Sequence, residues 1–419
     1  MSAAFVAYKL ATRAVSPLLQ PLLRHRAKRG KEDIGRIHER FARNLPPRLE
    51  GPLVWLHGAS VGESLLLLDL GNRLLAERPD LMLLFTSQTQ TSARILGSRL
   101  PDRAFHTMAP LDTPAIAKRF IQHWRPDVLI LGESEIWPNL LDAARKAGIK
   151  RALVNARMTK KSAEGWRKWR GLLKRVLGSF DLILTADTDT SSRLQSLLGK
   201  PIECAGNLKA SQGVPEANAT ELQRLAEGFI GNRQCLLAAS THEGEEALFL
   251  EAATNQADCA LIIAPRHPER GDEIENLLKS KRLAYARRSR QESPNQRTHI
   301  LLADTLGEMG LWYRLADAVY LGGGHKDGVG GHNPLEPVRL GKPVITGPHT
   351  YNFRDVMIDL EQRGMATTAM TPGRLREALA SAQQLDPKDV TSLNTDADAP
   401  MKKTLTELNS LLPIQMGEI

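Results

Sequence analysis

The stretch WLHGASVGES, residues 55–64, decides the fold. It follows an apolar lead-in and precedes the leucine-rich run LLLLDLGNRLL, which together predict a buried strand, a glycine turn and a helix. Glycine turns at helix starts usually face anions, because free N–H groups and the positive end of the helix dipole point outward there. One carboxylate, that of Glu63, nevertheless lies in this turn. Its presence requires an explanation.

The same alternation of short apolar runs and amphipathic stretches continues along the chain and restarts near residue 235. It predicts an α/β protein with two Rossmann-like, doubly wound domains that face each other across a cleft. Ligands of such sheets bind at the carboxyl ends of the strands. The expected strands are 54–57, 81–87, 127–134, 151–156, 181–187 and 202–206, then 235–240, 260–266, 283–289, 299–305, 318–324 and 342–348.

The chain has 419 residues, which suits two domains better than one core. A polar segment rich in turn formers begins at residue 209 and predicts the linker. The expected parts are a basic amphipathic segment (1–34), a first domain (35–208), a second domain (209–395) and a C-terminal tail (396–419) that packs back on the first domain.

Cysteine and histidine spacing excludes two classes of protein. Three cysteines without CxxC spacing predict a reducing, cytoplasmic compartment rather than a disulfide framework. Six of the histidines follow no HxH or HExxH spacing, so no metal site is predicted. These histidines are His57, His106, His242, His267, His332 and His349.

The net charge of +9 is concentrated at the N-terminus, where residues 1–50 hold 11 Lys/Arg and 4 Asp/Glu. The apolar pieces there are interrupted by Lys9, Arg13, Pro17 and Pro21, and a bilayer span needs about 20 apolar residues. The segment therefore suits an anionic membrane surface, and a frayed basic terminus is the alternative. A second basic stretch, 155–175, is either a solvated helix or a surface for an acidic, lipid-bound partner.

The glycine-rich stretch GGGHKDGVGGHNPLEP, residues 322–337, predicts a phosphate seat. Gly330 and Gly331 would leave main-chain N–H groups uncovered, and Asn333 would cap a helix that has Pro334 at its first position. Glu336 would accept hydrogen bonds from a ribose diol, or would only favour the helix dipole.

Cationic and hydroxyl side chains in the second half extend this seat. Arg266 can donate two parallel hydrogen bonds to a phosphate, although an ion pair with Glu269 is the alternative. Lys209 can add a point charge, and Ser240 and Thr241 can add hydroxyl donors. Together these groups predict a nucleotide ligand that is bound without a magnesium-carrying carboxylate pair of the DxD kind.

The first domain must then hold the attacking group. Glu63, Glu133 and Glu135 lie on loops at predicted strand ends. A carboxylate in a partly dry cleft can accept the proton of a hydroxyl as that hydroxyl attacks. We therefore interpret Glu63 as a general base, with a simple first-turn helix charge as the alternative.

Nine motifs, spread in order over about three-quarters of the chain, resemble those of the 3-deoxy-D-manno-octulosonic acid (Kdo) transferases. They are HGASVGE, GESEIWPN, NARMT, GNLK, STHEGEE, PRHPER, the GE of DTLGEMG, GGHNPLEP and GPHTYNFRD.

The resemblance implies a GT-B glycosyltransferase that moves Kdo from CMP-Kdo to the lipid A precursor, lipid IVA, in lipopolysaccharide core biosynthesis. It implies a single displacement with inversion, no metal and no cofactor, and a place at the cytoplasmic face of the bacterial inner membrane. Residues 35–208 would bind the acceptor and residues 209–395 the CMP-Kdo, with the anionic membrane surface as a partner and no nucleic acid.

The resemblance also implies roles for single residues. Glu63 corresponds to the proton acceptor, and Glu133 and Lys209 correspond to transition-state-stabilising positions, whereas His325 and Lys326 receive no role. The CMP-binding segments correspond to Pro265, Arg266, Gly307, Glu308, Met309, Asn333, Pro334, Leu335 and Glu336.

Two other functions remain open on sequence. One is a different GT-B enzyme that uses a UDP-sugar, either a transferase or an epimerase. The other is a basic, non-catalytic membrane or nucleic-acid binding protein, but no RNA-binding motif is present and aromatic residues make up only 5% of the chain.

Overall fold

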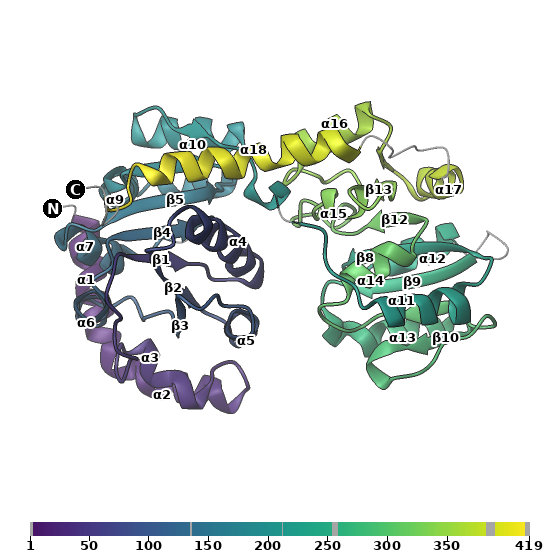
Figure 1. The fold of residues 1–419 in the computed structure, drawn as a ribbon, viewed down its shortest axis with the longest axis horizontal. Coiled ribbons are helices and arrows are strands. Elements are labelled where there is room, and N and C mark those ends of the chain that lie inside the picture. Colours follow the sequence, from purple (N-terminus) through teal and green to yellow (C-terminus); the bar gives the residue numbers. More distant parts are fainter. Residues whose placement is uncertain (1–2, 135, 212, 254–258, 383–389, 415–419) are drawn as a thin grey trace. The chain divides into compact units, whose positions relative to one another are not determined.

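The computed structural model describes residues 3–134, 136–211, 213–253, 259–382 and 390–414, with the side chains of 390–397 excepted. The chain divides into two compact units. Unit 1 comprises Met1–Ser211 with Asp398–Ile419, and unit 2 comprises Gln212–Ala397. Each unit carries its own sheet of parallel strands with helices packed on it (Figure 1). The prediction of an α/β fold with two Rossmann-like units is therefore confirmed.

The sheet of unit 1 has the strand order β3-β2-β1-β4-β5-β6-β7, and every pairing in it is parallel. The order reverses direction between β1 and β4, which is where doubly wound sheets place their ligands. The strands are β1 (Leu53–His57), β2 (Met82–Ser87), β3 (Ala104–Met108), β4 (Val128–Gly132), β5 (Lys150–Ala156), β6 (Leu182–Thr185) and β7 (Glu203–Cys204).

Both faces of this sheet are covered. Along β1, Leu53 and Trp55 belong to one apolar cluster whereas Val54 and Leu56 belong to another, because successive side chains of a strand point to opposite faces. The helices of unit 1 are α1 (Ala3–Val15), α2 (Leu19–Lys28), α3 (Ile37–Arg40), α4 (Val61–Glu77), α5 (Gln90–Gly97), α6 (Pro114–Trp124), α7 (Pro138–Lys146), α8 (Lys160–Arg167), α9 (Arg170–Val176) and α10 (Thr188–Leu198), with the short turns η1 (Ser16–Leu18), η2 (Ile34–Arg36), η3 (Leu177–Ser179) and η4 (Leu208–Ser211).

The C-terminal segment packs on unit 1. Helix α18 (Val390–Asn409) places Met401, Leu405 and Leu408 in the apolar cluster that covers the α4 face of the sheet. Gly206 permits this approach, because a Cβ built there would lie 2.8 Å from Cγ of Pro400. Lys209, which we expected to open the second domain, belongs to unit 1.

The sheet of unit 2 is also all parallel and has the order β10-β11-β9-β8-β12-β13-β14. Its strands are β8 (Gln234–Thr241), β9 (Cys259–Pro265), β10 (Tyr285–Arg287), β11 (Ile300–Leu302), β12 (Ala318–Leu321), β13 (Val344–Thr346) and β14 (Ala366–Thr368). Its helices are α11 (Ala219–Leu225), α12 (Glu245–Ala253), α13 (Gly271–Ser280), α14 (Met309–Leu315), α15 (Leu335–Val338), α16 (Arg354–Gln362) and α17 (Pro372–Ser381), with the short turns η5 (Ala226–Ile230), η6 (Pro268–Arg270) and η7 (Arg288–Arg290).

No helix in the described parts of the chain combines the length and the apolar character needed to cross a bilayer. Helix α1 is anchored to unit 1 by one face. The side chain of Phe5 on that face is buried, and the Tyr8 hydroxyl donates to Asp112 Oδ2 at 2.8 Å.

Candidate functional site

Glu63 is held in the first turn of α4 by its own loop. The Ser60 side chain caps the helix and accepts a hydrogen bond from the Glu63 N–H at 3.2 Å. In return, Glu63 Oε1 accepts from the Ser60 hydroxyl and Oε2 accepts from the Ala59 N–H, both at 2.9 Å. The residue is only 9% exposed. This reciprocal capping immobilises the carboxylate at the carboxyl end of β1.

Two glycines let the α4 turn lie against the sheet. A Cβ at Gly58 would come within 2.9 Å of Glu63 Cβ, and one at Gly132 would lie 3.8 Å from the same atom. Gly132 ends β4, the strand beside β1. Glu63 therefore lies at the switch point of the sheet, against the ends of two neighbouring strands.

Glu133 and Lys209 form an ion pair beside this turn. Lys209 Nζ lies 2.5 Å from Glu133 Oε1, and the Asn155 amide approaches the same oxygen at 3.4 Å. Asn155 Oδ1 also accepts from the Leu208 N–H at 3.0 Å, which fixes the turn that carries Lys209. A Cβ at Gly62 would lie 3.9 Å from Lys209 Nζ. The structure thus brings Glu63, Glu133 and Lys209 together, whereas Glu135 lies outside the described residues.

Backbone conformation marks the same cluster. Glu133 and Asn155 have φ values of 55° and 52°, which side-chain-bearing residues rarely adopt. The pairing of β5 with β6 shifts register between Leu153 and Ala156, around Asn155. Bulges and left-handed residues of this kind cost stability and collect where a side chain must be aimed. Asn155, which sequence reasoning did not single out within NARMT, is therefore part of the cluster.

In unit 2, Arg266, Glu336 and Tyr313 share one electrostatic environment. Burial raises the pKa of Glu336, while the Asn333 amide at 3.3 Å and the positive charge of Arg266 oppose that shift. Burial also raises the pKa of Tyr313, and the negative charge of Glu336 adds to this shift while Arg266 opposes it. Arg266 and Glu336 were both predicted to bind the nucleotide, and they lie near each other.

The glycine-rich loop differs from the predicted phosphate seat. The Gly331 N–H donates to the Gly323 carbonyl at 3.1 Å, so the prediction that it stays uncovered is wrong. Asn333 Oδ1 accepts from the Leu335 N–H at 3.2 Å, and α15 begins at Leu335 rather than at Pro334. Proline has no N–H, so the first amide available to the Asn333 side chain is that of Leu335.

The loops after β8 and β9 lie beside each other. The Arg266 N–H donates to the Thr241 carbonyl at 3.0 Å, and Arg266 follows Pro265, the last residue of β9. Among the described residues Arg266 makes no ion pair with Glu269, whose carboxylate lies 3.6 Å from His267 Nδ1. Ser240 has a φ of 54° at a register shift between β8 and β9.

Two residues that were predicted to bind the ligand have protein partners. The Thr241 hydroxyl, which we expected to face a ligand, donates to buried Glu246 Oε1 at 2.7 Å. Glu308, between Gly307 and Met309 at the start of α14, pairs with Arg288 at 2.6 Å. Burial would raise the pKa of Glu308, but hydrogen bonds from Arg288 and Thr305 lower it below its ordinary value.

Sequence spacing failed to reveal a group of histidines in unit 2. His242 Nε2 lies 2.9 Å from His332 Nε2, and the His267 ring centroid is 5.8 Å from that of His242. The sequence feature that could have revealed this group is that each of these histidines comes after a predicted strand. Within the described ranges, no group of three or more His, Cys, Asp or Glu side chains is arranged to hold a metal ion.

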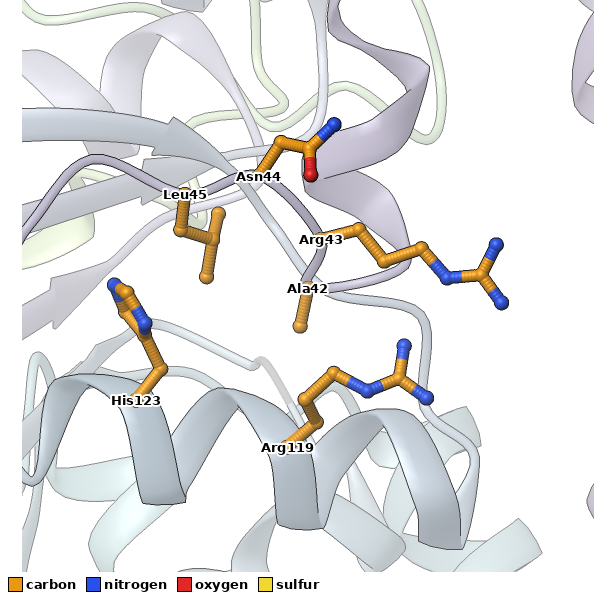
Figure 2. Close-up of a pocket in the computed structure, with 6 residues that line it drawn as sticks. All are labelled: Ala42, Arg43, Asn44, Leu45, Arg119 and His123. Atoms are coloured by element: carbon orange, nitrogen blue, oxygen red, sulfur yellow. The ribbon is translucent and has the colours of Figure 1, made fainter.

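A surface hollow of about 520 Å³ lies elsewhere on unit 1 (Figure 2). It opens between the loop that follows α3 and the outer face of α6. Because none of the predicted site residues lines it, we do not assign the chemistry to this hollow. Its lining residues are Ala42, Arg43, Asn44, Leu45, Arg119 and His123.

Comparisons with known proteins agree on one family. The family model of 3-deoxy-D-manno-octulosonic acid transferases matches residues 35–212. The chain is 35% identical over 332 residues to the 3-deoxy-D-manno-octulosonic acid transferase of Rickettsia bellii, covering 78% of each chain. It is 36% identical over 386 residues to that of Bordetella pertussis, covering 86% of this chain and 87% of the relative.

A glycosyltransferase structure from Rickettsia africae matches 87% of this chain and 99% of its own, with a TM-score of 0.59 and 10% identity. This likeness supports the GT-B fold only. The two sequence relatives also support membership of their family, because they are over 30% identical to this chain along most of both chains. The chain therefore belongs to the 3-deoxy-D-manno-octulosonic acid transferase family, and it is a Kdo glycosyltransferase.

Proposed function

We propose that this Kdo transferase moves Kdo from CMP-Kdo to the lipid A precursor, lipid IVA, in lipopolysaccharide core biosynthesis. The transfer would invert the anomeric centre, need no metal ion and occur at the cytoplasmic face of the inner membrane. The observation that carries the proposal is the immobilised Glu63 carboxylate beside the Glu133–Lys209 pair.

In this mechanism Glu63 is the proton acceptor. Hydrogen bonds from Ala59 and Ser60 hold its carboxylate in a fixed orientation. As the acceptor hydroxyl gives its proton to Glu63, its oxygen forms a bond to the anomeric carbon of Kdo. The bond from that carbon to the phosphate oxygen breaks, and CMP leaves with the electron pair. A single displacement of this kind inverts the anomeric centre.

The leaving phosphate needs compensating positive charge, which Arg266 would supply in place of a metal ion. Arg266 suits this role because its guanidinium is exposed and makes no ion pair among the described residues. Glu336 is within hydrogen-bond reach of Asn333, and its carboxyl group would bind the ribose hydroxyls of the donor.

The N-terminal helices suit contact with an anionic membrane. While Phe5 and Tyr8 attach α1 to unit 1, the side chains of Val6, Leu10 and Leu18 are 38%, 62% and 65% exposed. An exposed apolar face beside a basic segment binds the boundary between headgroups and acyl chains of anionic lipids. An enzyme that takes a lipid acceptor needs such a surface.

The test is to incubate the protein with CMP-Kdo and tetra-acylated lipid A precursor and to measure the product mass. The expected product is heavier by one or more Kdo units, with and without EDTA, and NMR of the new linkage should show inversion. Loss of transfer in EDTA would contradict the metal-free mechanism. Competitive titration of CMP, CDP and UDP decides the donor, since tighter binding of UDP than of CMP would favour a UDP-sugar enzyme.

A further inference from the structure

His242 and His332 form a hydrogen-bonded pair at the carboxyl edge of the unit 2 sheet. His242 directly follows β8, and His332 lies in the glycine-rich loop after β12. Their Nε2 atoms are 2.9 Å apart, the ring planes differ by 5° and the centroids are 5.2 Å apart. The rings therefore meet edge to edge in one plane, with one Nε2–H donating to the other Nε2.

The buried carboxylate of Glu245 holds together the two loops that carry this pair. Glu245 Oε2 accepts from the His242 N–H at 2.9 Å and from the Gly323 N–H at 2.8 Å, which ties the loop after β8 to the loop after β12. Oε1 accepts from the His325 N–H at 2.9 Å. Gly323 also leaves room for the ring, because a Cβ there would lie 3.0 Å from Cδ2 of His332.

This arrangement limits how many protons the pair can hold. A neutral pair has one proton between the two Nε2 atoms, and a singly protonated pair keeps that hydrogen bond. A second added proton would place two N–H groups against each other. The His242–His332 pair can therefore change between neutral and one positive charge, which would balance the single negative charge of one carboxylate.

Burial and basic neighbours disfavour protonation of His242. Burial lowers the pKa of His242, and the positive charges of three neighbours lower it further while one carboxylate opposes them. The groups that face His242 are Glu245 of α12, Arg266 and His267 after β9, Arg270 of η6, and His332. Arg270 is already paired with Glu246 at 2.7 Å, so Arg266 is the neighbouring cation left for a ligand.

We propose that the His242–His332 pair binds the carboxylate of the donor sugar, beside the phosphate at Arg266. This inference rests on the proposed function, in which the donor is CMP-Kdo. Kdo is an octulosonic acid, so its CMP derivative carries two anionic groups, one phosphate and one carboxylate. One guanidinium carries a single positive charge, which balances only one of these two anionic groups, and the histidine pair supplies the second positive site. Binding of the carboxylate would draw one proton onto the pair.

The experiment separates the sugar carboxylate from the phosphate. In the variants His242→Gln and His332→Gln, the amide can still hydrogen-bond but cannot take up a proton. We expect the KM for CMP-Kdo to rise about tenfold or more in either variant, the usual effect of losing a hydrogen bond to a charged group. The inhibition constant of CMP, which lacks the sugar, should stay within about twofold. His299→Gln is the matched control, since it lies in unit 2 at the amino end of β11.

The pH dependence gives a second measurement. A bound anion stabilises the protonated pair. The kcat/KM of the wild type for CMP-Kdo, divided by that of His332→Gln, should therefore rise as pH falls toward 6. At high pH this ratio should become constant. Equal weakening of CMP and CMP-Kdo would overturn the proposal by assigning the pair to the phosphate. Unchanged KM in both folded variants would also overturn it. If the wild type accepts no CMP-Kdo while CMP still binds, the proposed donor itself is wrong, and the inference falls with it.

Discussion

Replacing Glu63 by Gln should abolish proton acceptance while preserving the α4 turn. The Gln carbonyl can accept the Ala59 N–H, and the Gln amide can donate to Ser60 Oγ, which also accepts the backbone N–H of residue 63. We therefore expect a loss of stability below about 1 kcal/mol. Turnover should fall about 10²–10⁴-fold, the usual contribution of a positioned base. That range corresponds to about 2.7–5.4 kcal/mol in the activation barrier.

The variant Ser60→Ala provides the comparison, because it removes the cap and leaves the carboxylate. Loss of the cap should cost about 0.5–2 kcal/mol, and each kcal/mol lowers the melting temperature of a unit of this size by about 2–4 °C. Its turnover should fall far less than that of Glu63→Gln, since the Ala59 N–H still holds Glu63. Glu77→Gln, at the far end of the same helix, is the control for the chemical change itself.

The assay is the initial rate of Kdo transfer at saturating CMP-Kdo, combined with thermal melting and CMP titration. CMP affinity should be the same in all four proteins. If Glu63→Gln keeps turnover within about fivefold of the wild type, Glu63 is only a helix cap. If Ser60→Ala loses as much turnover as Glu63→Gln, the position of the carboxylate matters but its basicity is not demonstrated.

Three further changes should have measurable effects. Arg266→Ala should weaken CMP binding about tenfold or more in calorimetry, and unchanged affinity would remove Arg266 from the phosphate site. Leu10→Glu should reduce co-sedimentation with anionic vesicles without changing CMP affinity, and equal sedimentation would refute the membrane surface. Hydrogen bonds from Arg224 and Arg288 lower the pKa of Glu221 from 4.5 to about 2. The stability that Glu221 contributes should therefore be complete above pH 4.5 and be lost as pH falls toward 2, and Arg288→Ala should flatten this loss in acid melting curves.

Much of the fold could be predicted from the sequence, because buried parallel strands leave continuous apolar runs. The run VWLH corresponds to β1 and the run LMLLFTS to β2. The short strand β14, Ala366–Thr368, was missed because three residues carry no usable periodicity. A leucine-bearing helix was predicted only after Pro400, because proline usually ends a helix, whereas α18 begins at Val390 and contains that proline.

The site was less predictable, because side-chain partners depend on contacts between distant segments. The ion pair of Glu133 with Lys209 joins residues that are 76 positions apart, and the His242–His332 contact joins residues that are 90 positions apart. Sequence reasoning placed Glu133, His242 and His332 in segments at or after predicted strand ends and Lys209 at the domain junction, but it could not determine which pairs would meet. It also assigned the Thr241 hydroxyl to a ligand, because the partner Glu246 is visible only once α12 packs on β8.

Backbone strain occurs at strand ends in both of these clusters. An N-terminal helix cap or a surface ion pair needs no left-handed residue, since ordinary conformations and exposed side chains suffice. Yet in both units a residue other than glycine adopts positive φ at a register shift near the carboxyl end of a strand, namely Asn155 and Ser240. Glycine would adopt either conformation without strain, so a side chain kept there indicates that its position is required. In unit 1 that side chain is the Asn155 amide, which contacts both Glu133 and the turn of Lys209. The strain therefore supports catalysis at this edge of the sheet on grounds independent of the family resemblance.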